Sequence, residues 1–395
     1  MRRSPSQLIG QAATTFRARF GGGPVACGVA PGRVEILGNH TDYNGGAVLT
    51  AAIDRYVVAV GRPMARRCVR VHSAKLDRDA EIDLEVLTRD ARPDWSSYVK
   101  SVFTVLGAAG VEPGGMEVVI ASGVPIGAGL SSSAALEAAL AMLVLCVRSA
   151  TIDSVELARL LQRGENEYVG VRCGLLDQFS SLHGQADRLI FLDCTTCEHE
   201  TLSLGSPAPA IVVVDSRVSR EFVGNQAPYN LRREECELAA ERLSRALGRT
   251  LTGLCRASSE ELERYASDIP EPALSRARHV IGEHERVLAA RVALKSGDVT
   301  RLGALMGESH GSSRRYFDNS CDALDQLCEL AAGQGGLIGG RLCGGGWGGC
   351  TVNLVESGAV ESFVAGMKRA VATLPEPTPQ VHVCYASDGA SGCML

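Results

Sequence analysis

The sequence predicts an α+β protein of two domains, the first over residues 1–203 and the second over residues 204–395. The chain has 395 residues, and a domain commonly holds roughly 150 residues. Short apolar runs typical of strands alternate with helical runs in the first half, whereas charged helical runs dominate after residue 215. Between the halves, residues 203–210 contain only Leu, Gly, Ser, Pro and Ala, which indicates a linker.

Each expected element follows from a local pattern. An amphipathic run over 8–20 predicts a short helix, and a run over 131–147 that is apolar on nearly every face predicts a buried one. Mixed polarity over 154–169 favours another amphipathic helix. Apolar, β-branched runs predict the strands, which are expected at 57–61, 116–120, 189–193 and 211–215, and again within 336–354 and 380–385. Further helices are expected from residue 232 and over 276–295.

Composition excludes several classes of protein. With 45% hydrophobic and 22% charged residues, the chain is neither disordered nor fibrous. Its net charge of −5 argues against a nucleic-acid groove, which needs clustered positive charge. No apolar stretch reaches the length of a membrane span. We therefore expect a cytoplasmic monomer with no nucleic-acid or membrane partner.

The fourteen cysteines are spread irregularly along a long chain, unlike the dense pattern of a small secreted scaffold. The close pair Cys194 and Cys197, with His199 nearby, resembles half a zinc site. Because no second pair with this spacing follows, buried thiols are the favoured interpretation. Residues 2–20 lack Asp and Glu, as a transit peptide does, although a short helix explains the same pattern.

A glycine- and serine-rich segment, residues 124–135, lies between an expected strand and the buried helix. Glycines let the backbone approach an anion, and a helix N-terminus presents unpaired N–H groups to it. Hydroxyl groups of consecutive serines add further donors. The segment predicts a phosphate cradle without a lysine, since none of the four lysines stands in a Walker A motif. An ordinary strand-to-helix turn with a serine N-cap is the alternative.

Residues 30–46 form a polar loop in which Arg, Asn, His, Asp and Tyr stand beside glycines. So many hydrogen-bonding side chains on a short loop suit recognition of a polyhydroxylated ligand. A ligand that left one of these buried groups without a hydrogen bond would bind with a less favourable free energy. The alternative is a plain hairpin turn, for which Asn44 and Gly45 are a strong signal. The two interpretations are compatible.

These segments resemble a known family. Residues 30–46 resemble the galactokinase signature, 124–135 the phosphate motif of the GHMP kinase superfamily, and 343–350 its third, glycine-rich motif. The resemblance extends over 95–100, 173–178 and 278–286, in the family's order. It implies a two-lobed GHMP kinase fold, with a ribosomal-S5-like N-terminal lobe and a ferredoxin-like C-terminal lobe carrying added helices. The active site would lie between the lobes.

The resemblance also implies a reaction, the transfer of the ATP γ-phosphoryl group to the anomeric C1 hydroxyl of D-galactose. By similarity, Arg33 would stabilise the developing charge and Asp177 would receive the proton. A carboxylate beside an arginine is a weak base in the ground state. In a loose transition state for phosphoryl transfer, the hydroxyl proton needs to be removed only late in the reaction. Whether Asp177 acts as a base or as an orienting group therefore stays open.

The remaining site residues are carried over in the same way. Sugar recognition falls to Arg33 together with Asn39, His40, Asp42, Gly174 and Tyr229. The phosphates would be held by Gly127, Gly129, Leu130, Ser131, Ser132 and Ser133, with Trp95 either near adenine or in the core. For Mg²⁺ the family pattern selects Ser133 and Glu165 as ligands, with Glu167 as the alternative acid if the match is shifted by two residues.

One position departs from the family. The usual motif has Glu where this chain has Asn39, at a place the resemblance assigns to the sugar's C6 hydroxyl. Asn removes a negative charge and adds two N–H donors, so a uronic acid is no longer excluded by charge. The alternatives to D-galactose are therefore another aldose (galacturonate, an amino sugar or a pentose) or a sugar sensor without turnover.

Overall fold

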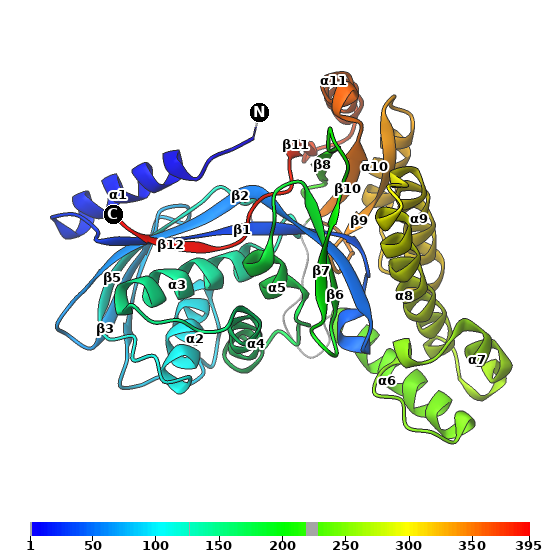
Figure 1. The fold of residues 1–395 in the computed structure, drawn as a ribbon, viewed down its shortest axis with the longest axis horizontal. Helices are drawn as coiled ribbons and strands as arrows, with labels where there is room; N and C mark the ends of the chain where they lie inside the picture. The colour runs from blue at the N-terminus through cyan, green and yellow to red at the C-terminus, as the bar shows by residue number, and fades with distance from the viewer. Residues whose placement is uncertain (1, 126, 219–227) are drawn as a thin grey trace.

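The computed structural model describes residues 2–125, 127–218 and 228–395 and divides into two lobes, each built on one sheet (Figure 1). In the first lobe the sheet has eight strands. These are β1 (Ala26–Leu37), β2 (Ala47–Pro63), β3 (Cys68–Ser73), β4 (Arg78–Asp83), β5 (Met116–Ser122), β6 (Arg188–Asp193), β7 (His199–Ser203) and β12 (Ser391–Met394). Their order is β12-β1-β2-β5-β3-β4, with β6 paired to β2 and β7 paired to β6.

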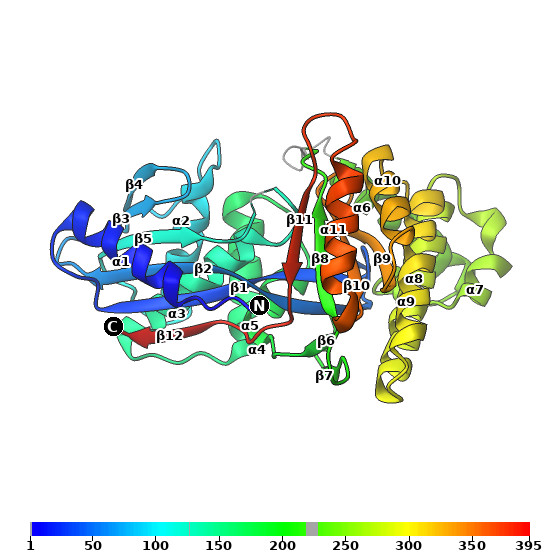
Figure 2. The same cartoon turned by 90° about the horizontal axis from the view of Figure 1, so that it is seen from above.

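Helices cover both faces of this sheet. They are α1 (Ser6–Phe20), α2 (Trp95–Ala108), α3 (Ser132–Arg148), α4 (Ser154–Gly164) and α5 (Leu176–His183). Figures 1 and 2 show α1 on one face and α2 to α5 on the other. Helix α3, the predicted buried helix, starts at the end of the phosphate segment and packs along β1 and β2. This packing aims its N-terminus at the space between the lobes.

The second lobe carries a four-stranded antiparallel sheet of order β11-β8-β10-β9. Its strands are β8 (Ala210–Asp215), β9 (Leu337–Cys343), β10 (Cys350–Val355) and β11 (Gln380–Cys384). Its helices are α6 (Pro228–Leu247), α7 (Ser259–Arg264), α8 (Ala273–Lys295), α9 (Val299–Ser312), α10 (Asp322–Ala332) and α11 (Val360–Val371). This strand order is that of a ferredoxin-like sheet. Within it, Val212 and Val214 pack against α10 and α11, whereas Ile211 and Val213 join the core shared with the first lobe.

The two lobes share one hydrophobic core, which runs from β1 and β2 of the first sheet to β10 of the second. The predicted boundary between residues 203 and 204 falls between β7 and β8, which belong to different sheets. The last strand, β12, crosses back and pairs with β1, with Cys393 opposite Cys27. The end of the chain therefore belongs to the first sheet, so the first lobe is built from two segments of the chain and the second lobe lies between them.

Most of the expected elements are confirmed within a few residues, but the polar loop is shorter than predicted. Residues up to Leu37 belong to β1, and all twelve residues of this strand are buried. Both faces of this strand are covered, so its polar residues are buried rather than exposed on a loop. Arg33 and Glu35 are each paired with an oppositely charged side chain. Only 38–46 connect β1 to β2, through the short 3-10 helix η1 (Asp42–Asn44).

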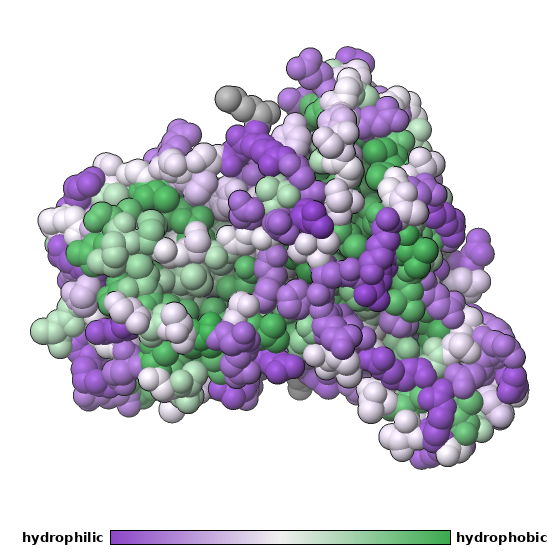
Figure 3. Space-filling model, viewed as in Figure 1, coloured by the Kyte–Doolittle hydropathy of each residue, from purple (hydrophilic) through white to green (hydrophobic). Residues whose placement is uncertain are grey.

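The surface is mixed in character. Figure 3 shows polar side chains spread over both lobes, with apolar residues gathered over the first lobe at the left of the view. Within the described residues, no helix combines the length and the apolar character that crossing a bilayer requires.

A buried carboxylate anchors the connection between β1 and η1 to the second lobe. Glu283 of α8 is fully buried, and its Oε1 accepts hydrogen bonds from the backbone N–H groups of Gly38 (2.9 Å) and Asn39 (3.2 Å). Burial alone would raise its pKa, but the guanidinium groups of Arg286 and Arg341 hold the pKa well below its usual range. Glu283 therefore stays ionised and ties the polar connection to a helix of the other lobe.

We predict that Glu283→Gln lowers the free energy of unfolding by about 3–5 kcal/mol, because it removes the buried charge that pairs with the partly buried Arg286 and helps Glu35 to balance the buried Arg341. Urea unfolding followed by circular dichroism measures the change. Glu234→Gln, at an exposed position of α6, is the control and should shift stability by less than about 0.5 kcal/mol. Equal effects of the two variants would contradict the anchoring role.

Candidate active site

A cavity of about 620 Å³ lies between the lobes and gathers nearly every residue that the sequence singled out. The predicted residues that line it are Arg33, Asn39, His40, Asp42, Gly127, Gly129, Leu130, Ser131, Ser132, Ser133, Glu165, Gly174, Asp177 and Tyr229. Trp95 is absent from the lining; as the first residue of α2, it packs against the core of the first lobe. The packing of α2 therefore favours the core interpretation for Trp95.

An ion pair stands at the centre of the cavity. Arg33 projects from β1, and its Nε (2.7 Å) and Nη2 (2.6 Å) both contact Oδ1 of Asp177, in the first turn of α5. The Nη1 of Arg33 donates to the carbonyl of Gly129 at 2.7 Å. Although burial alone would lower it, the neighbouring Asp177 charge raises the pKa of Arg33. A permanent cation is thus held between the carboxylate and the phosphate segment.

Part of the phosphate segment remains available to a ligand. Ser131, the residue before α3, has φ +50° and its side chain makes no capping hydrogen bond, so the predicted N-cap alternative is wrong. Its buried Oγ has no hydrogen-bond partner among the described residues. A Cβ at Gly127, whose φ is +79°, would meet nothing within 4 Å. Free N–H groups at the start of a helix, an unpaired hydroxyl and open space are what a phosphate group requires.

Carboxylates cluster beside the phosphate segment, where Glu165 lies within hydrogen-bonding reach of the Ser133 side chain. Glu165 begins a π-helical turn, η2 (Glu165–Val169), that follows α4, and its Oε2 accepts a 2.6 Å hydrogen bond from Gln178. Burial and the nearby Asp177 charge raise the pKa of Glu165 to about 7. A buried carboxylate whose pKa is raised by a neighbouring negative charge fits a site for a divalent cation, since Mg²⁺ needs only one or two protein oxygens. Glu167 is exposed and does not line the cavity.

A wall of close contacts bounds the part of the cavity nearest η1. A Cβ at Gly174 would lie 1.9 Å from Oδ2 of Asp42, so only glycine allows this approach. Burial, followed by the Glu35 charge, raises the pKa of Asp42 to about 7. His40 lies beside Tyr229 with ring centroids 5.4 Å apart, and burial lowers the pKa of His40 to about 3, which keeps it neutral. Hydroxyl-rich ligands suit such a set of donors and acceptors.

Asn39 is held on both ends of its side chain. Its Nδ2 donates to the carbonyl of Gly344 at 2.7 Å, and its Oδ1 accepts from Nδ2 of Asn319 at 2.8 Å. The carbonyl groups of the glycine-rich loop between β9 and β10 therefore touch the connection between β1 and β2. The carboxamide suits this position because a carboxylate would face the Gly344 carbonyl with a second acceptor.

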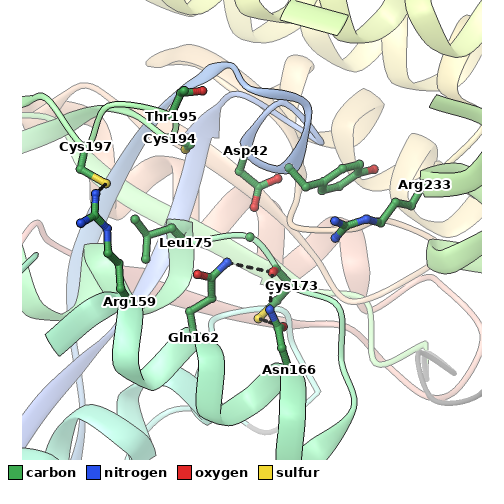
Figure 4. A pocket seen from close by; sticks show the side chains of 12 residues that line it. Asp42, Arg159, Gln162, Asn166, Cys173, Leu175, Cys194, Thr195, Cys197 and Arg233 are labelled. Atoms are coloured by element: carbon green, nitrogen blue, oxygen red, sulfur yellow. Dashed lines mark hydrogen bonds between the residues drawn. The ribbon is translucent and has the colours of Figure 1, made fainter. Parts of the chain in front are cut away.

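A second cavity, of about 420 Å³, lies behind the wall and shares Asp42, Cys173 and Gly174 with the first (Figure 4). Figure 4 shows the amides of Gln162 and Asn166 directed at the Cys173 carbonyl, at 3.2 and 3.5 Å. These bonds from α4 and η2 support the backbone just before Gly174. The glycine is thus held where its contact with Asp42 needs it.

Several lining residues were missed from the sequence. Asp215 ends β8 in the second lobe and Arg217 and Val218 follow it, while Tyr98 and Glu35 come from the first lobe. Polar residues directly after an apolar strand were a usable signal for Asp215 and Arg217. No local pattern marks Glu35, whose role depends on a partner, Arg341, 306 positions away at 2.9 Å.

Three family models match the chain. The galactokinase galactose-binding signature matches residues 14–63, the N-terminal domain of GHMP kinases matches 97–185, and the C-terminal domain of GHMP kinases matches 290–373. The matched ranges include the connection after β1, the phosphate segment with Asp177, and the glycine-rich loop.

Curated relatives and solved structures agree with these matches. A galactokinase of Roseiflexus sp. (strain RS-1) is 39% identical over 98% of this chain and 97% of its own length, and the human galactokinase is 38% identical over 90% of each. The structure of Lactococcus lactis galactokinase complexed with galactose superposes with a TM-score of 0.90 at 31% identity, covering 97% of this chain and 99% of that one. A mevalonate kinase structure, at 16% identity and a TM-score of 0.65, shares the fold alone. Taken with the site geometry, these similarities show that the chain belongs to the galactokinase family of GHMP kinases.

Proposed function

We propose that the protein transfers the γ-phosphoryl group of ATP to the C1 hydroxyl of D-galactose and releases galactose 1-phosphate and ADP. The observation that carries this proposal is the Arg33–Asp177 ion pair, which stands between a phosphate cradle and a wall of sugar-binding groups in one cavity. The relatives named above are galactokinases, and one was solved with galactose.

In the proposed step, the oxygen of the C1 hydroxyl attacks the γ-phosphorus while the bond to the β-phosphate oxygen breaks, and the proton of that hydroxyl passes to Asp177. The guanidinium of Arg33 lies against Asp177 and would stabilise the charge that spreads over the transferred group. Free N–H groups at the start of α3 would hold the phosphates of the leaving ADP. Because phosphoryl transfer depends mainly on positioning and charge stabilisation, Asp177 would also orient the hydroxyl.

Mg²⁺ belongs to the same proposal, with Ser133 and Glu165 as its protein ligands. When bound, the ion would neutralise the charge of the β- and γ-phosphates. Support comes from the carboxylate of Glu165, whose pKa is raised by burial and by the Asp177 charge, since a bound cation would offset both effects. The monomeric state and the cytoplasmic location stay predictions.

A second candidate substrate is a sugar with a carboxylate at C6. Asn39 is neutral and 1% exposed, and it lines the cavity. A neutral amide does not repel an anion as a carboxylate would. The sensor without turnover is disfavoured, because Arg33, Asp177 and the serines are all in place.

A coupled ATP assay across a panel of aldoses tests the proposal directly. We expect sugar-dependent ADP release to be fastest with D-galactose. Release that is independent of the added sugar, or absent with every sugar, would contradict it.

Asp177→Asn should lower kcat by about 10²–10⁴-fold, the range for a positioned acid–base group. The asparagine can still accept a hydrogen bond from Arg33, so the fold should be retained. Steady-state kinetics measures the loss, with the exposed Asp187→Asn as a control of wild-type activity. Near-native kcat in a folded Asp177→Asn protein would remove Asp177 from the mechanism.

The KM for galactose should fall as the pH rises from 6 to 8. Asp42 has a pKa of about 7, so it loses its proton over this interval and becomes a better acceptor for sugar hydroxyl groups. Initial rates at saturating ATP give the profile. Asp42→Asn should bind galactose more weakly with a flat profile, and a wild-type profile in this variant would rule out Asp42 as the titrating group.

Asn39→Glu should reduce kcat/KM for galacturonate relative to galactose by roughly tenfold or more, because it brings two negative charges together. Both rates are measured on wild type and variant under the same conditions, so a loss of active protein cancels in the ratio. An unchanged ratio would show that residue 39 does not face C6.

A further inference from the structure

Asn319 joins the two loops that meet at the sugar end of the cavity. It follows the π-helical turn η5 (Ser313–Phe317) of the second lobe and is fully buried. Its Nδ2 lies 2.8 Å from Oδ1 of Asn39, 3.0 Å from the carbonyl of Gly345 and 3.2 Å from Nε2 of His40. Its side chain therefore touches the connection after β1 and the glycine-rich loop at once.

The surroundings determine which way the Asn319 amide points. The carboxamide oxygen of Asn39 and the carbonyl of Gly345 can only accept hydrogen bonds. Turning the amide over would place the Asn319 oxygen against both of them. In the orientation observed, Oδ1 of Asn319 is buried without a partner among the described residues. The orientation that directs the Asn319 amide at Asn39 therefore leaves the Asn319 oxygen unpaired. Buried polar atoms without a hydrogen-bond partner are rare in proteins, so this one calls for an explanation.

The backbone of Asn319 holds the glycine-rich loop as well. Its carbonyl accepts a 2.7 Å hydrogen bond from the backbone N–H of Trp347. A Cβ at Gly346, where φ is +93°, would lie 1.9 Å from this carbonyl. Because the loop packs so closely on Asn319, the carbonyl groups of Gly344 and Gly345 are held in place.

This arrangement determines which group of Asn39 remains for a ligand. Its Oδ1 accepts from Asn319 at 2.8 Å and is 3.5 Å from the Ser313 hydroxyl. One Nδ2 hydrogen is used by the Gly344 carbonyl at 2.7 Å. An amide nitrogen carries two hydrogens, so Asn39 has one N–H left to offer to the cavity that it lines.

We propose that Asn319 is a positioning residue that sets sugar specificity through Asn39. It holds the Asn39 carboxamide so that the sugar's C6 end meets an N–H donor, and the site therefore selects aldoses with a hydrogen-bond acceptor at C6. This inference rests on the proposed function and adds to it the chemical class of the C6 substituent.

The test compares D-galactose with 6-deoxy-D-galactose, which lacks the C6 oxygen. We expect Asn319→Asp and Asn319→Ala to lower the kcat/KM ratio of galactose to its 6-deoxy analogue by about 3–10-fold, the effect of one hydrogen bond. The change should lie in KM rather than kcat, because the contact is made equally in the ground state and the transition state. Asn319→Asp keeps the side-chain volume, so an equal effect of both variants assigns the role to the N–H donor.

A double-mutant cycle distinguishes positioning from direct contact. Asn39→Ala should lower the same ratio, and the double variant Asn39→Ala/Asn319→Ala should lower it no further. Asn353→Ala is the matched control: this asparagine of β10 is also fully buried, donates to the Val212 carbonyl at 3.0 Å and has an unpaired Oδ1, but does not line the cavity. It should reduce stability and leave the ratio unchanged.

The outcomes separate the positioning role of Asn319 from the proposed kinase function. An unchanged ratio in Asn319→Asp, or effects of Asn39→Ala and Asn319→Ala that simply add, would overturn the positioning role. A wild-type ratio near one would also overturn it, because the C6 oxygen would then not be recognised. Failure of wild type to phosphorylate any aldose would instead remove the proposed function itself.

Discussion

The ion pair between Arg33 and Asp177 is the interaction on which the rest of the site depends. Arg33 is 5% exposed and reaches both the carboxylate on α5 and the carbonyl of Gly129. One guanidinium therefore joins β1 of the first sheet, the phosphate segment and the helix that carries the proposed base. Since a buried charge is retained only when it is well paired, the pair constrains all three segments together.

The second lobe supplies the polar groups that complete the sugar end of the cavity. Glu283 holds the backbone after β1, while Asn319 and the carbonyl of Gly344 hold the side chain of Asn39. Buried charges and amides are costly unless they are satisfied. Their presence between the lobes indicates that the lobes are held in one arrangement, which a continuous apolar core reinforces.

The sequence predicted elements whose patterns are local, such as the apolar helix α3, the strands β5 and β6, and the phosphate segment. It did not predict that Arg33 lies on a strand, because a strand covered on both faces lacks the alternation that reveals one. Glu283 and Asn319 were also missed: their partners at Gly38 and Asn39 lie 245 and 280 positions away, and such contacts leave no local signal. Family motifs located most of the cavity lining, while Trp95, expected either near adenine or in the core, is partly buried against the core and does not line the cavity.

The central claim is that the C1 hydroxyl of the sugar and the γ-phosphate of ATP meet at the Arg33–Asp177 pair. Phosphorus NMR of the product formed from D-galactose and ATP tests this most directly, because it identifies the carbon that carries the phosphate. The account predicts a phosphorus signal coupled to the anomeric proton. Phosphate on C6, or inorganic phosphate released to water, would contradict it.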